Sequence, residues 1–171
     1  INPRLGEFLK GSVLYRTSLF TSLINWPKSL VSNRPKIILD IPLENVNKLV
    51  ALKNKALDQG VNLDKDDWFK AKLRTSYSSK SIPIKLRLKG DLTDHLKDGR
   101  WSFRVKVRKG SYYQGMKTFS IQPAATRSYL FESVFQRLLK QEGLPFLRYD
   151  FVELKINGSN KGIYAVEESF S

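Results

Sequence analysis

The chain has 171 residues, of which 41% are hydrophobic and 12% aromatic, so it suits one folded domain and argues against a disordered chain. Lys and Arg number 30 against 16 Asp and Glu, and the net charge of +14 suggests an anionic partner. The absence of cysteine excludes disulfides and thiolate chemistry, and a single histidine argues against a histidine-based metal site.

The N-terminal region, residues 1–35, mixes apolar and hydroxyl residues without clean periodicity. We interpret it as an N-terminal arm, helical or irregular, that lies across the domain. No apolar run in the chain is long enough to span a bilayer, so we expect no transmembrane segment. The chain starts at Ile1 rather than Met, so the loss of a signal peptide or anchor stays open, and the compartment is undetermined, with the cell envelope or another extracytoplasmic location as one alternative.

The next region, residues 36–79, combines a predicted strand and a predicted helix. KIILDI (36–41) is a short apolar run with β-branched residues, which predicts a strand. Pro42 suits a first helical position, apolar residues then recur at helical spacing, and Gly60 ends the helix. WFKAKLRT (68–75) alternates and predicts a further strand. We assign this region as a strand-helix appendage.

A basic three-stranded meander follows. Residues 82–90 and 102–108 alternate strictly, with apolar side chains on one face and Lys or Arg on the other. Residues 116–122 predict the third strand. Between residues 80 and 122, eleven Lys or Arg stand against three Asp, so more than half of the excess positive charge lies in a quarter of the chain.

The C-terminal third predicts a helix and a hairpin. Thr126 is a candidate N-cap for a helix that runs to about Glu142, with Gly143 as its C-cap. Its apolar face should lie on the sheet; this face comprises Leu130, Phe131, Val134, Phe135, Leu138 and Leu139. Strands over 149–156 and 162–168 are joined through Asn157-Gly158, a strong hairpin signal. Antiparallel strands with one packed helix form an α+β pattern, in the element order of a protein-kinase small lobe.

Several short motifs together resemble the spore coat protein H (CotH) kinase family of atypical kinases. The resemblance covers roughly residues 36–171 and is strongest after Pro83. Each motif is weak by itself, but the ordered set is fairly specific. The motifs lie at residues 87–91 (RLKGD), 94–95, 101–106, 115–122, 132, 142–144, 148–152, 157–158, 162–164 and 167–168.

The resemblance implies phosphoryl transfer from ATP with Mg²⁺ to a protein substrate. It also implies a domain division: an N-terminal arm over 1–35, the strand-helix appendage over 36–79 and a kinase-like N-lobe over 80–171. In such kinases the catalytic and metal-binding aspartates lie in the large lobe. We therefore expect this chain to be the ATP-binding lobe, with no catalytic or metal-binding residue of its own, and inactive as a fragment.

The candidate nucleotide-binding residues are basic side chains of the meander and two glutamates. Arg87 and Arg104 lie in neighbouring strands, where like charges repel unless an anion lies between them. By analogy with kinases, Lys117 would pair with the helix residue Glu132 and hold phosphates, with Arg104 or Lys106 as alternative partners of that glutamate. Glu167, with Glu168, would lie at the interlobe hinge, where backbone groups meet adenine.

The turn at 90–99 takes the place of a kinase phosphate-covering loop. Its glycines stand only at the ends, so it is not a conventional glycine-rich cradle. Asp91 and Asp94 would hold neighbouring cations, and His95 would contact a phosphate, the acceptor or only solvent.

Two other functional classes stay open. A basic sheet with aromatic residues also suits a non-catalytic module that binds nucleic acid or an acidic surface. Nucleic acid is the less favoured partner, because no RNA-recognition signature is present and most aromatic residues alternate inward. The third class is a structural, envelope-associated domain that keeps the fold without catalysis.

Overall fold

The computed structural model describes residues 35–60, 67–76, 78–90, 96, 100–108 and 110–169. Pro35–Ser171 form one compact unit. Most of the predicted N-terminal arm, and the turn residues Asp91, Asp94 and His95, lie outside the described residues. Within the described part, no helix is long and apolar enough to cross a membrane, as predicted.

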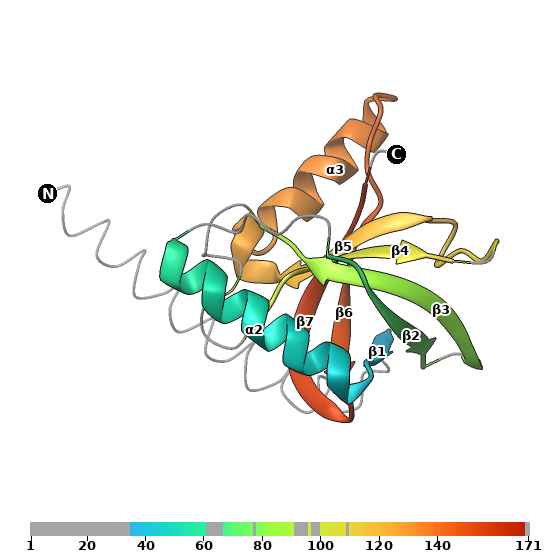
Figure 1. Ribbon diagram of the computed structural model, residues 1–171. Helices are drawn as coiled ribbons and strands as arrows, with labels where there is room; N and C mark the ends of the chain where they lie inside the picture. The colour runs from blue at the N-terminus through green and yellow to red at the C-terminus, as the bar shows by residue number, and fades with distance from the viewer. Residues whose placement is uncertain are drawn as a thin grey trace, which may run out of the picture. The chain divides into compact units, whose positions relative to one another are not determined.

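Seven strands form a closed barrel in the order β1-β2-β3-β4-β5-β7-β6 (Figure 1). Neighbouring strands are antiparallel except β1 and β6, which pair in parallel, Lys36 opposite Glu153, and so close the barrel. The strands are β1 Lys36–Asp40, β2 Phe69–Thr75, β3 Ser78–Leu88, β4 Phe103–Val107, β5 Thr118–Pro123, β6 Tyr149–Ile156 and β7 Ser159–Glu168.

Alternation along the strands builds the barrel core. In β3 and β4 the residues Leu86, Phe103 and Val105 are fully buried, while Arg87 and Arg104 face outward. Phe119 and Ile121 of β5 extend the same apolar interior. The hairpin between β6 and β7 turns at Asn157-Gly158, where both residues have positive φ angles of 48° and 83°, the conformation that this dipeptide favours.

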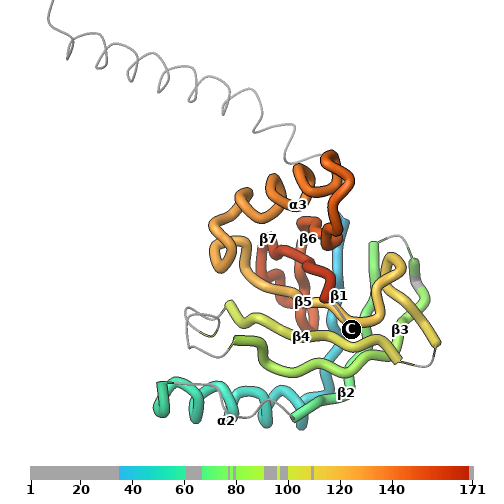
Figure 2. Tube along the Cα trace, turned by 90° about the horizontal axis from the view of Figure 1, so that it is seen from above, coloured from blue at the N-terminus to red at the C-terminus, as the bar shows by residue number. Residues whose placement is uncertain are grey.

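Helix α2 (Leu43–Gln59) forms as predicted, and part of its apolar face packs against the barrel, while Leu43, Val50 and Leu57 are exposed. Leu49 and Ala56 are buried, and Val46 and Leu52 pack against the core cluster. Gly60 ends the helix in the left-handed conformation, with a φ angle of 73°. α2 and α3 lie on opposite sides of the barrel (Figure 2).

Helix α3 (Phe131–Gln141) is shorter than predicted, and its polar face, not its apolar face, is the buried one. The positive φ angles of Ser128 and Tyr129, 51° and 57°, separate it from a 3-10 helix, η2 (Ala124–Arg127), so the chain is not helical throughout from Thr126. Ser133 and Gln136 are the buried residues of α3. The predicted apolar contact with the sheet is wrong, because Phe131, Val134 and Leu138 are 70%, 53% and 51% exposed.

The predicted fold class is also wrong. The protein is not an α+β kinase-like small lobe with an appended strand and helix, but a closed seven-stranded mixed barrel with two α-helices among the described residues. β1 lies between β2 and β6, so the first predicted strand belongs to the barrel itself. The individual strands and the β3-β4-β5 meander are confirmed.

Candidate functional site

A row of polar side chains crosses the outer face of the barrel. Arg87 of β3 lies opposite Arg104 of β4, which lies opposite Ser120 of β5. Ser120 in turn lies opposite Glu167 of β7, and Glu167 opposite Tyr149 of β6. Ser120, Glu167 and Tyr149 are buried although they face away from the core. Five strands therefore bring a continuous polar row to one side of the barrel.

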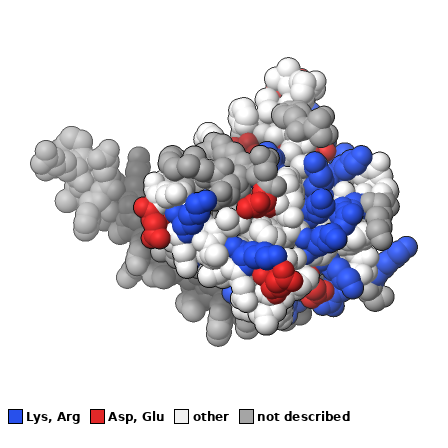
Figure 3. All heavy atoms as spheres, in the orientation of Figure 1, with Lys and Arg blue, Asp and Glu red and all other residues white. Residues whose placement is uncertain are grey.

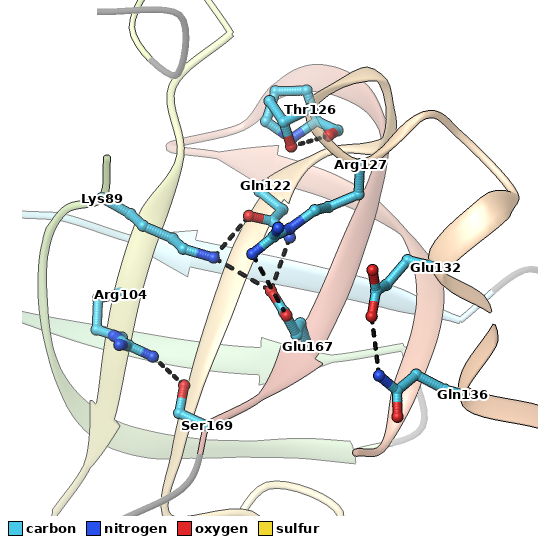
Figure 4. Close-up of polar contacts among 10 residues, drawn as sticks. Lys89, Arg104, Gln122, Thr126, Arg127, Glu132, Gln136, Glu167 and Ser169 are labelled. Carbon is cyan, nitrogen blue, oxygen red and sulfur yellow. Dashed lines mark hydrogen bonds and ion pairs between the residues drawn. The ribbon is translucent and has the colours of Figure 1, made fainter. Parts of the chain in front are cut away.

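Glu167 is the centre of a buried polar cluster (Figure 4). Its Oε2 accepts hydrogen bonds from Lys89 Nζ at 3.1 Å and from Gln122 Nε2 at 2.8 Å. Lys89 Nζ also donates to Gln122 Oε1 at 2.7 Å. Arg127 of η2 brings its Nη2 to 3.8 Å from Glu167 Oε1. Because a half-buried lysine and a buried carboxylate require each other, removal of either charge would leave the other uncompensated.

Burial sets the protonation behaviour of this cluster. It lowers the pKa of Lys89, against the opposing effect of Glu167, while the charges of Arg127 and Arg104 lower it further. Burial, together with the charges of Glu167 and Glu132, raises the pKa of Tyr149 to about 12. The hydroxyls of Ser120 and Tyr149 have no hydrogen-bond partner in the described part of the chain.

A cavity of about 290 Å³ opens beside this cluster. Lys89, Arg104, Arg127, Glu167, Glu168, Leu147 and Ser169 line it. Arg104 donates to the hydroxyl of Ser169, and Arg148 Nε lies 3.4 Å from Glu168 Oε2. Three cationic side chains thus line the cavity beside two carboxylates, and both carboxylates already have cationic partners. The excess of donors over acceptors favours an anionic ligand.

The predicted residues meet only in part. Arg104 and Glu167 line the cavity, and Arg87 stands next to Arg104 in the polar row. Glu132 of α3 accepts a hydrogen bond from Gln136 at 2.8 Å, on the α3 side of Glu167 (Figure 4). Lys117 is exposed, and the described residues include no ion pair between Lys117 and Glu132. The nucleotide-binding roles of these residues stay predictions.

A second row, of lysines, runs beside the polar row. Lys70 of β2 lies opposite Lys85 of β3, which lies opposite Lys106 of β4. Lys106 Nζ lies 5.3 Å from the ring centre of Trp68, and the Arg87 guanidinium 5.5 Å from it. Figure 3 shows Lys and Arg side chains gathered on this side of the barrel. We call Lys70, Lys85 and Lys106 the lysine row.

Sequence reasoning did not include Lys89, Gln122 and Arg127 among the site residues. Strand periodicity placed Lys89 on the same outer face as Lys85 and Arg87, but it gave no sign that the lysine contacts Glu167. Gln122 is a polar residue in an otherwise buried strand, which is a weaker signal. Arg127 lies in a short 3-10 turn, and no periodicity indicates its direction.

The comparisons with known proteins agree with the resemblance noted from the motifs. The family model described as CotH kinase protein matches residues 86–171, half of the chain. The chain therefore belongs to the CotH kinase family, which indicates a kinase-related function. Lys89, Arg104 and Glu167 lie in the matched region, whereas β1, α2 and β2 precede it. No curated protein matches the chain significantly.

Proposed function

We propose that the cavity beside Glu167 binds the phosphates of ATP, and that this chain is the nucleotide-binding part of a protein kinase. The observation that carries the proposal is the convergence of Lys89, Arg104 and Arg127 on one cavity inside the region that matches the family. Nucleotide phosphates are strong acceptors with several negative charges, and Arg presents a planar fork of donors that suits them.

The surrounding residues support this role by position. Glu167, buried among Lys89, Gln122 and Arg127, fixes the directions of these side chains before a ligand arrives. The hydroxyls of Ser120 and Tyr149 lie in the same polar row. Preorganised donors lose less conformational entropy on binding than mobile surface lysines do.

Mg²⁺ would accompany the nucleotide phosphates. In the described residues, no three acidic or histidine side chains come together in a way that could hold a metal ion. Glu167 and Glu168 already lie against cationic or amide donors. We therefore assign to this cavity the binding and orientation of phosphates, and we assign no base and no metal ligand within it. The proposal includes a protein substrate that accepts the phosphoryl group, and it does not identify that substrate.

The test is a titration of the 171-residue chain with Mg²⁺-ATP at about 0.15 M salt, followed by NMR. We expect saturable shifts that cluster around Arg104, Gln122 and Arg127. Arg127→Ala should weaken binding about 10- to 100-fold, because a hydrogen bond to a charged group contributes about 1.5–3 kcal/mol. AMP should bind more weakly than ATP, since its single phosphate leaves donors unused.

The matched control is Arg137→Ala, on an exposed position of α3, which should leave ATP affinity unchanged. If Arg127→Ala and Arg137→Ala weaken ATP binding equally, the effect is one of net charge, and the assignment of the cavity is wrong. If the chain shows no saturable response to Mg²⁺-ATP, the proposal that it binds ATP is wrong.

The lysine row supports a second candidate function, binding of a polyanion such as single-stranded nucleic acid. Like charges directly opposite each other destabilise a sheet, so an anion along the row would relieve their repulsion. A short oligonucleotide, titrated in parallel, should then shift signals of Lys70, Lys85 and Lys106, and its affinity should fall steeply with salt. Stronger binding of the oligonucleotide than of ATP would favour this candidate.

A further inference from the structure

An apolar cavity lies between α2 and the interior of the barrel. Its volume is about 210 Å³, and Val46 and Leu49 of α2 line it together with the inward-facing residues Phe103 and Tyr164. Trp101 also lines it. An apolar cavity of about 150 Å³ can bind benzene, so this one has room for an aromatic ring with a small substituent.

Two of the lining side chains have a polar atom without a partner. Trp101 Nε1 and the Tyr164 hydroxyl are buried and have no hydrogen-bond partner in the described part of the chain. Tyr164 is only 1% exposed. An unsatisfied buried donor costs about 1–3 kcal/mol, and native proteins leave few such groups. Two of them at one cavity indicate that a further molecule satisfies them.

Both atoms are able to donate a hydrogen bond to an acceptor on that molecule. The indole N–H of Trp101 can only donate. Burial raises the pKa of Tyr164 to about 12, so its hydroxyl keeps its proton near neutral pH and is also able to donate. One group with two acceptor oxygens could receive a hydrogen bond from each side chain.

The charges around the cavity favour an anion. Lys161 lines it, and Lys53 Nζ lies 5.5 Å from the centre of the Trp101 ring. The positive charge of Arg100 acts on the Tyr164 hydroxyl. Among the described residues that line the cavity, none is acidic.

We infer that this cavity binds a small aromatic carboxylate, with the ring among Leu49, Phe103 and Val46 and the carboxylate at Trp101 and Tyr164. The family match does not assign such a site, since α2 lies outside the matched residues. The inference is independent of the proposed nucleotide site, because the two cavities share no lining residue in the described part of the chain. A ligand here would join α2 to the matched part of the barrel.

The experiment is a titration of the whole chain with phenylacetate, followed through the indole N–H signal of Trp101 by NMR. Trp101→Phe assigns that signal. We expect a saturable shift with phenylacetate, together with slower hydrogen exchange of the indole proton. Acetate, which lacks the ring, and phenylacetamide, which lacks the charge, should each bind at least tenfold more weakly.

Two variants test the place of binding. Tyr164→Phe keeps the ring and removes the hydroxyl, and it should weaken phenylacetate binding about 10- to 100-fold, as the loss of one hydrogen bond to a charged group predicts. Leu49→Phe fills the cavity and should abolish binding, whereas Leu138→Phe, on exposed α3 surface, should not. Tyr164→Phe provides the decisive result if Leu49→Phe does not fold.

Other outcomes overturn the inference. An indole proton that exchanges with water and does not respond to phenylacetate would mean that the cavity holds water only. Acetate binding as strong as that of phenylacetate would mean simple attraction to surface cations. Phenylacetate binding that Tyr164→Phe leaves unchanged would place the ligand elsewhere. Arg127→Ala should change ATP binding and leave phenylacetate binding intact, so the two proposals fail separately.

Discussion

The two α-helices in the described part of the protein contact the barrel through different kinds of side chain: α2 through apolar residues and α3 through polar ones. α2 buries Leu49 and Ala56 in the core. α3 buries Ser133 and Gln136 and turns Phe131, Val134 and Leu138 toward solvent. Both helices are amphipathic, so their patterns of apolar residues are similar. The difference comes from the surfaces beneath them, because α2 meets the apolar interior of the barrel and α3 lies beside the polar row on its outer face.

The comparison shows that an apolar stripe on a helix does not determine what the helix faces. Gln136 Oε1 accepts a hydrogen bond from the backbone N–H of Leu147 at 2.7 Å, and Gln136 Nε2 donates to Glu132. Polar contacts therefore hold α3, and its apolar side chains form an exposed patch of the kind that marks interaction surfaces.

The largest effect expected from this comparison is the loss of the apolar anchor of α2. Leu49→Ala should lower the free energy of unfolding by about 2–5 kcal/mol, because Leu49 is fully buried and its truncation leaves a cavity. Leu138→Ala, the same change on α3, should stay within about 0.5 kcal/mol. Urea denaturation measures both. Equal losses would mean that Leu138 is buried in solution and would break the comparison.

The polar anchor of α3 should be the next largest contribution. Gln136→Ala removes the acceptor for the Leu147 amide, and it should cost about 1–3 kcal/mol if that amide stays buried. Gln141→Ala, at the exposed end of the helix, is the matched control. Hydrogen exchange of the Leu147 amide should accelerate in the first variant only; an unchanged rate would show that Gln136 does not hold this segment.

A smaller effect concerns the ion pair at the end of β1, just before α2. Arg74 donates to Asp40 through Nε at 2.7 Å and Nη2 at 3.0 Å, and the hydrogen bond from Arg74 lowers the pKa of Asp40. Because the folded-state pKa is depressed, the pair stabilises the protein above the unfolded-state pKa of Asp, and this stability is lost as the pH falls through the lower, folded-state pKa.

Asp40→Asn should therefore cost less than about 1 kcal/mol at pH 7, since both side chains are partly exposed and solvent screens the pair. The difference in the free energy of unfolding between this variant and the unmodified protein should shrink steadily as the pH falls below about 4. Asp58→Asn, on the exposed surface of α2, serves as control. A difference that persists in acid would mean that Asp40 acts through packing rather than charge.

The smallest effect on stability belongs to the exposed face of α3. Phe131→Ser should change the free energy of unfolding by no more than about 0.5 kcal/mol, since Phe131 is 70% exposed. It should, however, reduce the fluorescence of a bound apolar dye such as ANS, because the patch loses its largest exposed ring. Stability lost to a degree typical of a core phenylalanine would show that the patch is covered in solution.

Local patterns in the sequence predicted the strands well and their assembly poorly. Alternation from Ile84 to Leu88 and the Asn157-Gly158 turn are short-range signals, and both were confirmed. The closure of the barrel by β1 and β6 is a pairing between distant segments, and no local pattern encodes it. The predicted kinase-like lobe therefore lacked the parallel pairing of β1 with β6 that closes the barrel.

The candidate site was predictable to a similar extent. Strand periodicity placed Arg87 and Arg104 on one outer face, and the register confirms that they are opposite each other. The convergence of Arg127 on Glu167 depends on the positive φ angles at Ser128 and Tyr129, which end η2 before α3 begins. Non-glycine residues rarely adopt this conformation, and sequence patterns alone seldom indicate where they do.

The parallel pairing of Lys36 with Glu153 has a consequence for synthesis and folding. β1 leaves the ribosome more than a hundred residues before its partner β6, so for that time one of its edges stays open to other chains. A contact of such long sequence separation raises the contact order and slows folding. Closure of the barrel should therefore be a late step of folding, and nascent chains that stop before β6 should be the species most prone to aggregate.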